Sequence, residues 1–399
     1  MTQEATDEPR IGLALSGGGS RAIAFHLGCL RALDQKGILD RVKVISTVSG
    51  GSVVGALYAL HQDSFTTFED RVRRLLSQGL VKPSIRKALT TSEGVRAAYC
   101  WLVLAVVNTL VFALSVLLWA ISRLFPADKR PNRLFDRIHA PLMRFASRTT
   151  ILRRTLDEDV FCGKRLSDLS VSGPLLIVNA ADLRTGSAFY FSANSSGSWR
   201  LGECASNDIS IGHAVTASAS YPLLLPAIDE NLAFNKKDGT RRVERVTLTD
   251  GGIYDNLGLA PLWPDRDPSI SLNVSDIDSI ICCRAGYGSR FDPPSQSMIA
   301  RLKSAFACVH DRAQNATMKR LFDLHGSGRL KHVLLPYLGQ NDQRLKYPPD
   351  DLVTREDTYD YPTDFSAMSD EWIDKLSKRG EQLTLALIAE HWPELLGNS

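Results

Sequence analysis

A short strand that runs directly into a glycine-flanked serine is the feature that most constrains the fold of this chain. Residues 42–48 are rich in β-branched side chains, and this run ends at Ser49-Gly50-Gly51. A helix-compatible run, residues 53–60, follows at once. A strand, a sharp turn that carries a serine, and a helix are typical of a nucleophile elbow, where small neighbours let the backbone bend tightly. Ser49 is therefore a candidate nucleophile, and the alternative is an ordinary turn with a serine near the helix cap.

A glycine-rich loop precedes this elbow in the chain. Residues 11–15 are expected to form a buried strand and residues 22–33 have helical spacing, with Ser16-Gly17-Gly18-Gly19-Ser20-Arg21 between them. Backbone N–H groups in such a loop can point at an anion, aided by the helix N-terminus. A nucleotide-binding loop is one interpretation, although neither of its usual glycine patterns fits. The oxyanion hole of an acyl-transfer enzyme, which uses the same backbone donors, is the other.

The α/β pattern returns in the second half of the chain. Strands are expected at 175–178, 187–192, 243–248 and 278–283, with a possible strand at 332–338, and helices at 209–219, 296–324 and 369–396. The third of these strands leads into Thr249-Asp250-Gly251-Gly252. Functional side chains gather at the carboxyl ends of strands in open α/β sheets, so Asp250 and Ser49 could share one site. A purely structural turn aspartate is the alternative.

A basic insert with an apolar centre separates the two α/β regions. Residues 71–150 contain fourteen Lys or Arg and three acidic residues, whereas the whole chain has a net charge of only +3. Within the insert, residues 97–122 contain no charged residue, and Trp101 and Trp119 lie near the ends of the run. This length and these aromatic ends are typical of a membrane segment. A buried core helix is the alternative, but such helices are usually shorter and less uniformly apolar.

The remaining composition indicates a cytosolic catalytic domain. Seven cysteines are scattered without a CxxC pair, and the N-terminal residues do not resemble a signal peptide, so we expect reduced thiols. No zinc-ligand spacing is present, and we expect neither a structural metal nor a cofactor. The basic insert suits anionic lipid or nucleic acid by charge alone, and its apolar centre favours lipid.

Five motifs together resemble the patatin-like phospholipase family. In the order of that family they are SGGGSRA (16–22), TVSGGS (47–52), NAADLRTG (179–186), ASASYPLLLP (217–226) and TDGGIYDN (249–256). The joint pattern covers about residues 11–60 and 174–259 and is far more specific than any single motif. The resemblance implies a three-layer α/β/α core, formed by residues 1–70 and 150–290. The insert (71–149) would then carry the membrane segment, and residues 291–399 would form a C-terminal extension packed on the core.

The resemblance also implies roles for particular residues. Ser49 would attack an ester carbonyl, and Asp250 would take its proton in a two-residue site without histidine. Backbone amides of Gly17, Gly18 and Gly19 would hold the oxyanion. Arg21 would stabilise the loop or meet a lipid phosphate, and residues 217–226 would shape the pocket.

Two residues depart from the family pattern, and one alternative mechanism remains open. Thr47 stands where the elbow usually has glycine, and Ala22 stands where glycine normally follows the basic residue. A β-branched Thr47 would crowd a tight elbow. Because His26 and His213 lie near the motifs in sequence, a histidine-assisted triad is the alternative to a Ser49–Asp250 pair.

The expected function is that of a membrane-associated lipid acyl hydrolase acting on phospholipids or lysophospholipids through an acyl-enzyme on Ser49. The alternatives are a neutral-lipid or general esterase, and an inactive membrane scaffold that kept the fold. The expected partners are lipid substrate and an anionic membrane surface, with no nucleic acid, and the catalytic domain is expected on the cytoplasmic side. The sequence does not indicate the head group, the acyl position or the oligomeric state.

Overall fold

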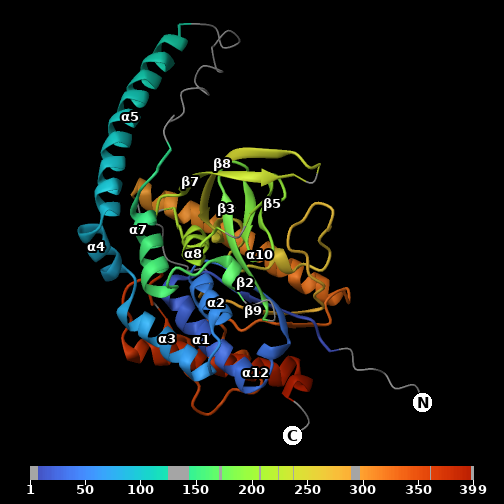
Figure 1. Ribbon diagram of the computed structural model, residues 1–399. Helices are drawn as coiled ribbons and strands as arrows, with labels where there is room; N and C mark the ends of the chain where they lie inside the picture. Colours follow the sequence, from blue (N-terminus) through green and yellow to red (C-terminus); the bar gives the residue numbers. More distant parts are fainter. Residues whose placement is uncertain are drawn as a thin grey trace.

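A mixed sheet runs through the centre of the molecule (Figure 1). The computed structural model describes residues 8–124, 143–169, 173–205, 208–222, 224–236, 238–288, 297–359 and 361–396. Within these residues the sheet has ten strands, in the spatial order β10 (His332–Leu334), β9 (Ser279–Cys283), β1 (Ile11–Leu15), β2 (Val42–Thr47), β3 (Leu175–Asp182), β4 (Ser187–Phe191), β5 (Ser196–Ser198), β6 (Gly202–Cys204), β7 (Ile228–Asn235) and β8 (Arg241–Asp250). The first five are parallel, and the remaining pairings are antiparallel.

Helices cover both faces of the parallel part of the sheet. On one face, Leu13 and Leu15 of β1 join a buried core with α1 (Gly19–Gln35), α2 (Gly50–Leu60), α3 (Phe65–Gln78) and α12 (Asp370–His391). On the other face, Ala14 joins a second core with α10 (Met298–Gly326) and the segment after β8. Since alternate residues of β1 enter different cores and all are buried, a near-continuous apolar strand forms here. The expected three-layer α/β/α arrangement is confirmed.

The course of β3 brings two distant strand ends together. β2 runs parallel to β3 and ends with Thr47 opposite Val178. β8 runs antiparallel along the same strand and ends with Asp250 opposite Ala180. The two strands therefore meet head to head along β3, and the turns that follow them lie next to each other.

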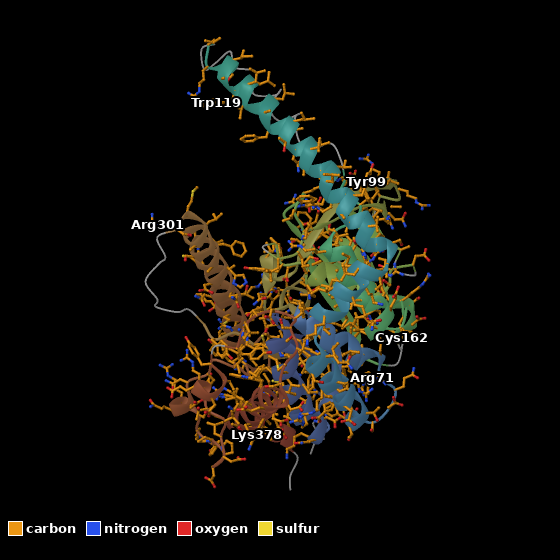
Figure 2. The ribbon with its side chains drawn as sticks, turned by 90° about the vertical axis from the view of Figure 1, so that its left-hand side faces the viewer. Arg71, Tyr99, Trp119, Cys162, Arg301 and Lys378 are labelled. Carbon is orange, nitrogen blue, oxygen red and sulfur yellow. The ribbon has the colours of Figure 1, made fainter. Side chains whose placement is uncertain are left out.

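A long helix projects from the body of the protein. After α4 (Val81–Thr90), α5 (Ser92–Ser122) extends away from the sheet, and Figure 2 shows Tyr99 near the body and Trp119 far from it. Near its base, Cys100 and Leu104 pack with Ala146, just before α7 (Arg148–Thr155). The rest of α5 leaves its large apolar side chains exposed. It is long and apolar enough to cross a membrane by length and composition.

Several elements differ from the expectation. The strands β5, β6 and β7 were not predicted, because two are only three residues long and β7 mixes acidic and apolar residues without clean alternation. The C-terminal strand ends early at Leu334, and α12 ends at His391, followed by a short turn of helix (Pro393–Leu396). Leu223 of the expected pocket wall lies outside the described residues. The same is true of the basic residues after the apolar run, Lys129, Arg130, Arg133 and Arg137.

Candidate active site

Ser49 lies at the sharp turn between β2 and α2. It adopts φ 52° and ψ −118°, a backbone conformation that non-glycine residues rarely hold and that usually marks a functional turn. The turn is packed so closely that a Cβ on Gly50 would collide with the carbonyl oxygen of Gly19. The methyl group of the unusual Thr47 packs against Gly55 of α2. Because Gly55 has no side chain, there is room for this methyl group. The elbow therefore tolerates its β-branched residue.

Asp250 ends β8 and faces this serine. Its carboxylate is buried, accepts a 2.7 Å hydrogen bond from the Gly252 amide at Oδ1, and lies near enough to the Ser49 side chain for that group to lower its pKa. Burial is the largest influence on this group and raises its pKa to about 7, although the Gly252 amide and the Ser49 side chain act in the opposite direction. A carboxylate with this pKa can accept a proton near neutral pH.

The end of α8 (Ile211–Ser218) holds both turns in place. The Ser49 amide donates to Ser218 Oγ at 2.9 Å, and the Ser52 hydroxyl lies 2.9 Å from the same oxygen. On the other turn, the Gly251 amide donates to the Ser218 carbonyl at 3.3 Å and the Asp250 amide to the Ser220 carbonyl at 3.1 Å. Residues 217–226 thus brace Ser49 and Asp250 directly. We expected only a pocket wall here, since the sequence could not indicate these long-range bonds.

The glycine loop lies against the serine turn. Gly17 is so close that a Cβ there would lie 3.3 Å from the Ser49 Cβ. Its amide donates to the Asn256 carbonyl at 3.1 Å, whereas the amides of Gly18 and Gly19 have no acceptor among the described residues. Both of these glycines have positive φ, 150° and 60°. Two N–H groups beside Ser49 are therefore available to an anion.

Arg21 ties this loop to the C-terminal part of the chain. Its guanidinium donates to the carbonyls of Ala285 at 2.9 Å and Tyr361 at 3.1 Å, and it stacks over the Tyr287 ring. These contacts favour the loop-stabilising role over the phosphate contact. The neighbouring Ala22 is a fully buried helix residue whose amide donates to the Gly18 carbonyl at 3.2 Å.

Helix α10 brings unpredicted residues to the site. The Phe306 ring packs edge-on against Tyr221 and stacks on His310. The side chain of His310 lies near the backbone of Gly252, and Gln314 Nε2 lies 3.0 Å from His310 Nδ1. Burial lowers the pKa of His310, which favours the neutral ring. No motif marks these residues, because they come from a helix that carries no family pattern.

The two histidines of the alternative triad have other partners. His213 Nε2 lies 3.0 Å from Glu230, and its Nδ1 lies 3.4 Å from Arg153. His26 Nε2 lies 2.9 Å from the Ser16 carbonyl oxygen. Neither histidine has a hydrogen bond to Ser49 or Asp250 among the described residues, so these contacts do not support a histidine-assisted triad.

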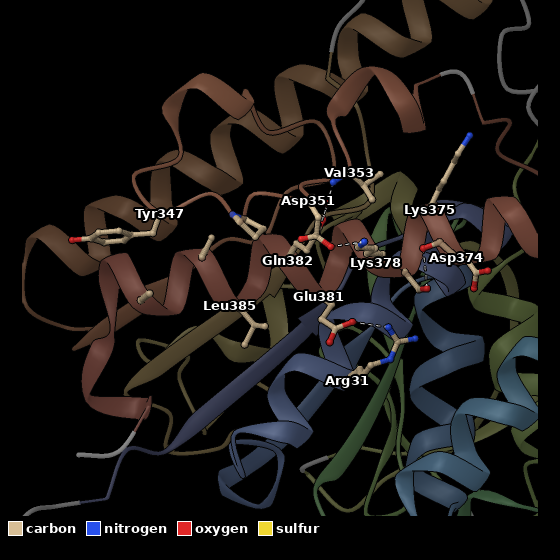
Figure 3. Close-up of a pocket in the computed structure, with 14 residues that line it drawn as sticks. Arg31, Tyr347, Asp351, Val353, Asp374, Lys375, Lys378, Glu381, Gln382 and Leu385 are labelled. Atoms are coloured by element: carbon tan, nitrogen blue, oxygen red, sulfur yellow. Dashed lines mark hydrogen bonds and ion pairs between the residues drawn. The ribbon is translucent and has the colours of Figure 1, made fainter. Parts of the chain in front are cut away.

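A surface hollow of about 740 Å³ lies elsewhere, along α12 (Figure 3). Its charged residues are already paired: Arg31 with Glu381, Lys378 with Asp351, and Asp374 with Arg73. This hollow includes neither Ser49 nor Asp250 and has no free charge of one sign with which to select a ligand.

Comparisons with known proteins agree with the architecture. A family model described as Patatin-like phospholipase matches residues 13–263. Two proteins named Lysophospholipase NTE1 are similar over 58 residues, at 45% identity in Pyricularia oryzae and 47% in Mycosarcoma maydis. These matches cover 14% of this chain and only 4% and 3% of the two proteins. The chain thus corresponds to a small part of these relatives.

A solved structure shares the fold. Human GIVD cytosolic phospholipase A2 superposes with a TM-score of 0.54 at 11% identity, over 98% of this chain and 60% of that chain. At this identity the similarity concerns the fold alone.

Proposed function

This chain belongs to the patatin-like phospholipase family, and we propose that it is a membrane-associated lipid acyl hydrolase that cleaves carboxylic esters of phospholipids or lysophospholipids. The observation that carries the proposal is the Ser49 elbow beside a buried Asp250, whose pKa is raised to about 7 by burial and lowered in part by the Ser49 side chain. Similarity to the lysophospholipases over 58 residues supports the same substrate class.

In the proposed mechanism Asp250 accepts the proton of the Ser49 hydroxyl as Ser49 Oγ attacks the ester carbonyl carbon. The tetrahedral intermediate collapses, the carbon–oxygen bond of the ester breaks, and the leaving alcohol takes the proton from Asp250. The acyl group stays on Ser49. A water molecule then attacks the acyl carbonyl with Asp250 again as base, which releases the fatty acid and restores the hydroxyl.

The glycine loop would stabilise the negative charge that develops on the carbonyl oxygen. Gly18 and Gly19 supply the donors in this proposal, since the Gly17 amide is already bonded to Asn256. The amide of Gly50, the residue after the nucleophile, occupies the position of a further donor in related elbows. Each such donor is worth roughly 10²–10³ in kcat.

Two helices support attachment to a membrane. Large apolar side chains of α5 are exposed along most of its length. On α4, Val81, Ile85 and Leu89 form an exposed apolar stripe at a spacing of four residues, which is typical of a helix lying in a membrane interface. The sequence did not reveal this second element, because the stripe is only three residues long.

Some of the basic side chains near these helices form ion pairs, and others do not. Arg71, Arg73 and Lys87 are engaged in ion pairs with acidic side chains, whereas Arg74, Lys82 and Arg86 are exposed and have no ion pair among the described residues. We therefore assign the preference for anionic lipid to the latter three. Each is worth about 1 kcal/mol near an anionic surface, less at high salt.

The path of the chain supports attachment from one side of the membrane. At 31 residues, α5 is about 46 Å long, enough for one crossing and too short for two. The chain leaves the body near Cys100 and is packed there again at Ala146. A single crossing would also separate Ser49 from Asp250. The proposal is an in-plane or re-entrant α5, with the catalytic domain on the cytoplasmic side because its flanks are basic.

A serine-reactive fluorophosphonate probe tests the activity. We expect the full chain to be labelled, Ser49→Ala to lose the label, and Ser192→Ala, which removes another buried serine hydroxyl, to keep it. Product analysis on phospholipid, lysophospholipid and triacylglycerol vesicles then separates the phospholipase from a neutral-lipid esterase. Vesicle binding without labelling or hydrolysis would identify an inactive scaffold and refute the proposal.

Cysteine labelling tests the attachment. Single cysteines at Thr91 and Leu124, placed at the two ends of α5 in a chain lacking the exposed Cys162 and Cys308, should react with a membrane-impermeant maleimide from the same side of sealed vesicles. The buried cysteines stay in place. Reaction from opposite sides would contradict one-sided attachment.

A further inference from the structure

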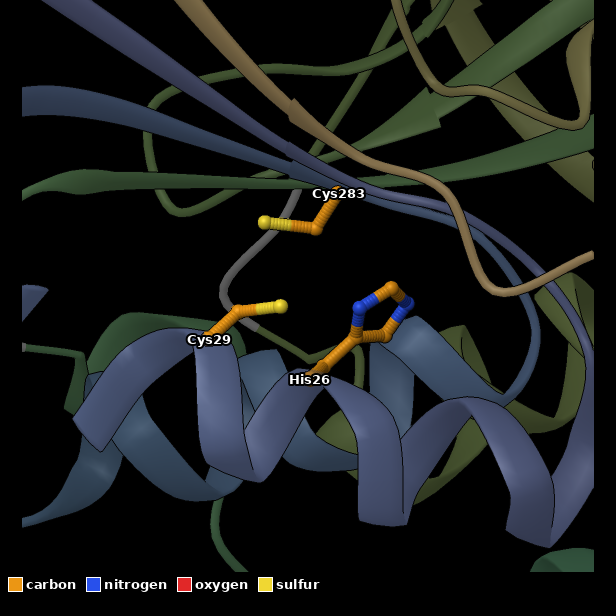
Figure 4. Close-up of side chains that lie close together, drawn as sticks. All are labelled: His26, Cys29 and Cys283. Atoms are coloured by element: carbon orange, nitrogen blue, oxygen red, sulfur yellow. The ribbon is translucent and has the colours of Figure 1, made fainter. Parts of the chain in front are cut away.

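Three potential metal ligands lie together in the core beneath the glycine loop. His26 and Cys29 are one turn apart on α1, and Cys283 is the last residue of β9 (Figure 4). The ligand atoms of the three side chains lie within 4.8 Å of one another, and all three side chains are fully buried. The sequence could not suggest this group, because Cys283 is far from the other two and forms no ligand-spacing motif with them.

The orientation of His26 leaves one ring nitrogen available. Nε2 lies 2.9 Å from the Ser16 carbonyl oxygen, and because a carbonyl can only accept, Nε2 carries the proton. Nδ1 therefore holds the lone pair of the neutral ring. This nitrogen is buried and has no hydrogen-bond partner in the described part of the chain. It points toward the sulfur atoms (Figure 4).

The two sulfur atoms lie within 4.8 Å of this nitrogen, and both cysteines are fully buried. Deprotonated cysteines in a dry core are costly without a cation next to them, and a bound metal ion would supply that charge.

We propose that His26 Nδ1, Cys29 Sγ and Cys283 Sγ bind a thiophilic metal ion, and that Zn²⁺ is the ion that fits best. Imidazole nitrogen and thiolate sulfur are the preferred ligands of Zn²⁺. Two thiolates and Zn²⁺ sum to zero charge, which suits a fully buried site. A metal-bound histidine usually donates its other ring N–H to a carbonyl or carboxylate, which orients the ring, and the bond from His26 Nε2 to the Ser16 carbonyl has this form.

The geometry needs only a small contraction. Ligand atoms around a tetrahedral zinc lie roughly 3.7 Å apart, so the three atoms would close by about 1 Å at most. No fourth His, Cys, Asp or Glu joins the group among the described residues. A neutral oxygen would complete the shell, and the Gly380 carbonyl lies 3.6 Å from Cys29 Sγ.

The position of the site gives it a structural consequence. The Ser16 amide donates to the Cys283 carbonyl at 3.1 Å, and the Ser16 carbonyl faces His26. Bound metal would therefore hold both backbone partners of Ser16, the residue that precedes Gly17, in place. The proposal itself does not rest on the enzymatic activity, since metal content and activity are measured separately.

Metal analysis of the purified full chain tests the site. We expect wild-type protein, prepared under reducing conditions in zinc-containing medium, to retain a single Zn²⁺ per chain after desalting, and Cys29→Ala and Cys283→Ala to lose it. Cys282→Ala is the matched control, because this equally buried neighbour on β9 belongs to the core on the opposite face of the sheet. A wild-type protein without zinc, or equal loss in Cys282→Ala, overturns the proposal.

A second measurement avoids the risk that the variants do not fold. Wild-type protein prepared with Co²⁺ in place of Zn²⁺ should show thiolate-to-cobalt charge-transfer bands, and a chelator should lower the Tm of the wild type. The absence of these bands overturns the proposal, as does a Cys29–Cys283 disulfide without bound metal in the protein under the same reducing conditions.

Discussion

Replacing Asp250 by Asn should stabilise the folded protein while abolishing its activity. The pKa of this carboxyl rises from 3.8 to about 7 on folding, mainly because the group is buried. Below pH 3.8 both states are protonated and burial adds no ionisation cost. As the pH rises toward 7, the unfolded state releases the proton and the folded state does not, so stability is lost across this window. Above pH 7, the loss of folding stability caused by burying the ionised Asp250 reaches about 4 kcal/mol, at roughly 1.4 kcal/mol per pKa unit.

The Asn variant mimics the protonated acid and keeps an oxygen for the Gly252 amide, so it escapes this cost. Between about pH 5.5 and about pH 8, its free energy of unfolding should rise relative to that of the wild type by about 2 kcal/mol. Urea unfolding followed by tryptophan fluorescence measures the difference. Asp278→Asn is the control, because the pKa of Asp278 is lowered and both of its states are ionised throughout this range. A difference for Asp250→Asn that does not change with pH would refute the reasoning.

Four further predictions follow from the same contacts. The kcat/KM of the wild type should fall about tenfold per pH unit below 7, because Asp250 must be deprotonated to act as base, and a flat pH–rate profile would contradict this role. Ser49→Ala and Asp250→Asn should be no worse together than singly, because a proton donor and its acceptor act as a unit; additive losses in single-turnover assays would separate them. Gly50→Ala should reduce kcat about 10²-fold by displacing the Gly19 carbonyl, while Gly326→Ala, whose added Cβ meets open space, should not. His310→Ala should lower kcat about tenfold with little change in KM, since it removes a polar neighbour of the Gly252 backbone, and unchanged kinetics would exclude a positioning role.

Local patterns made much of the fold predictable. The apolar runs of β1, β2 and β3 and the glycine turns after them fix strand and helix positions, because buried parallel strands and tight turns allow few residue types. The small strands β5 and β6 escaped prediction, because three residues carry too little pattern.

The candidate site was less accessible to sequence reasoning. Ser49 and Asp250 could be named, since each sits in a distinctive glycine-flanked turn. The supporting roles of Ser218, Ser220 and His310 could not be predicted, because each depends on a contact between segments far apart in the chain. Nothing in the spacing of the cysteines distinguishes Cys283, which faces α1, from Cys282, which faces the opposite core.

The way in which α8 holds both turns has a mechanical consequence. The amides of Ser49 and Gly251 bond to Ser218, the last residue of α8, and the Asp250 amide bonds to Ser220 just after it, so a shift of this helix would move nucleophile and base together. Helix α10 meets the site through the side chains of Phe306 and His310, which lie against Tyr221 and near Gly252, next to the same anchor. The spacing between the reacting groups would therefore be preserved when α8 shifts.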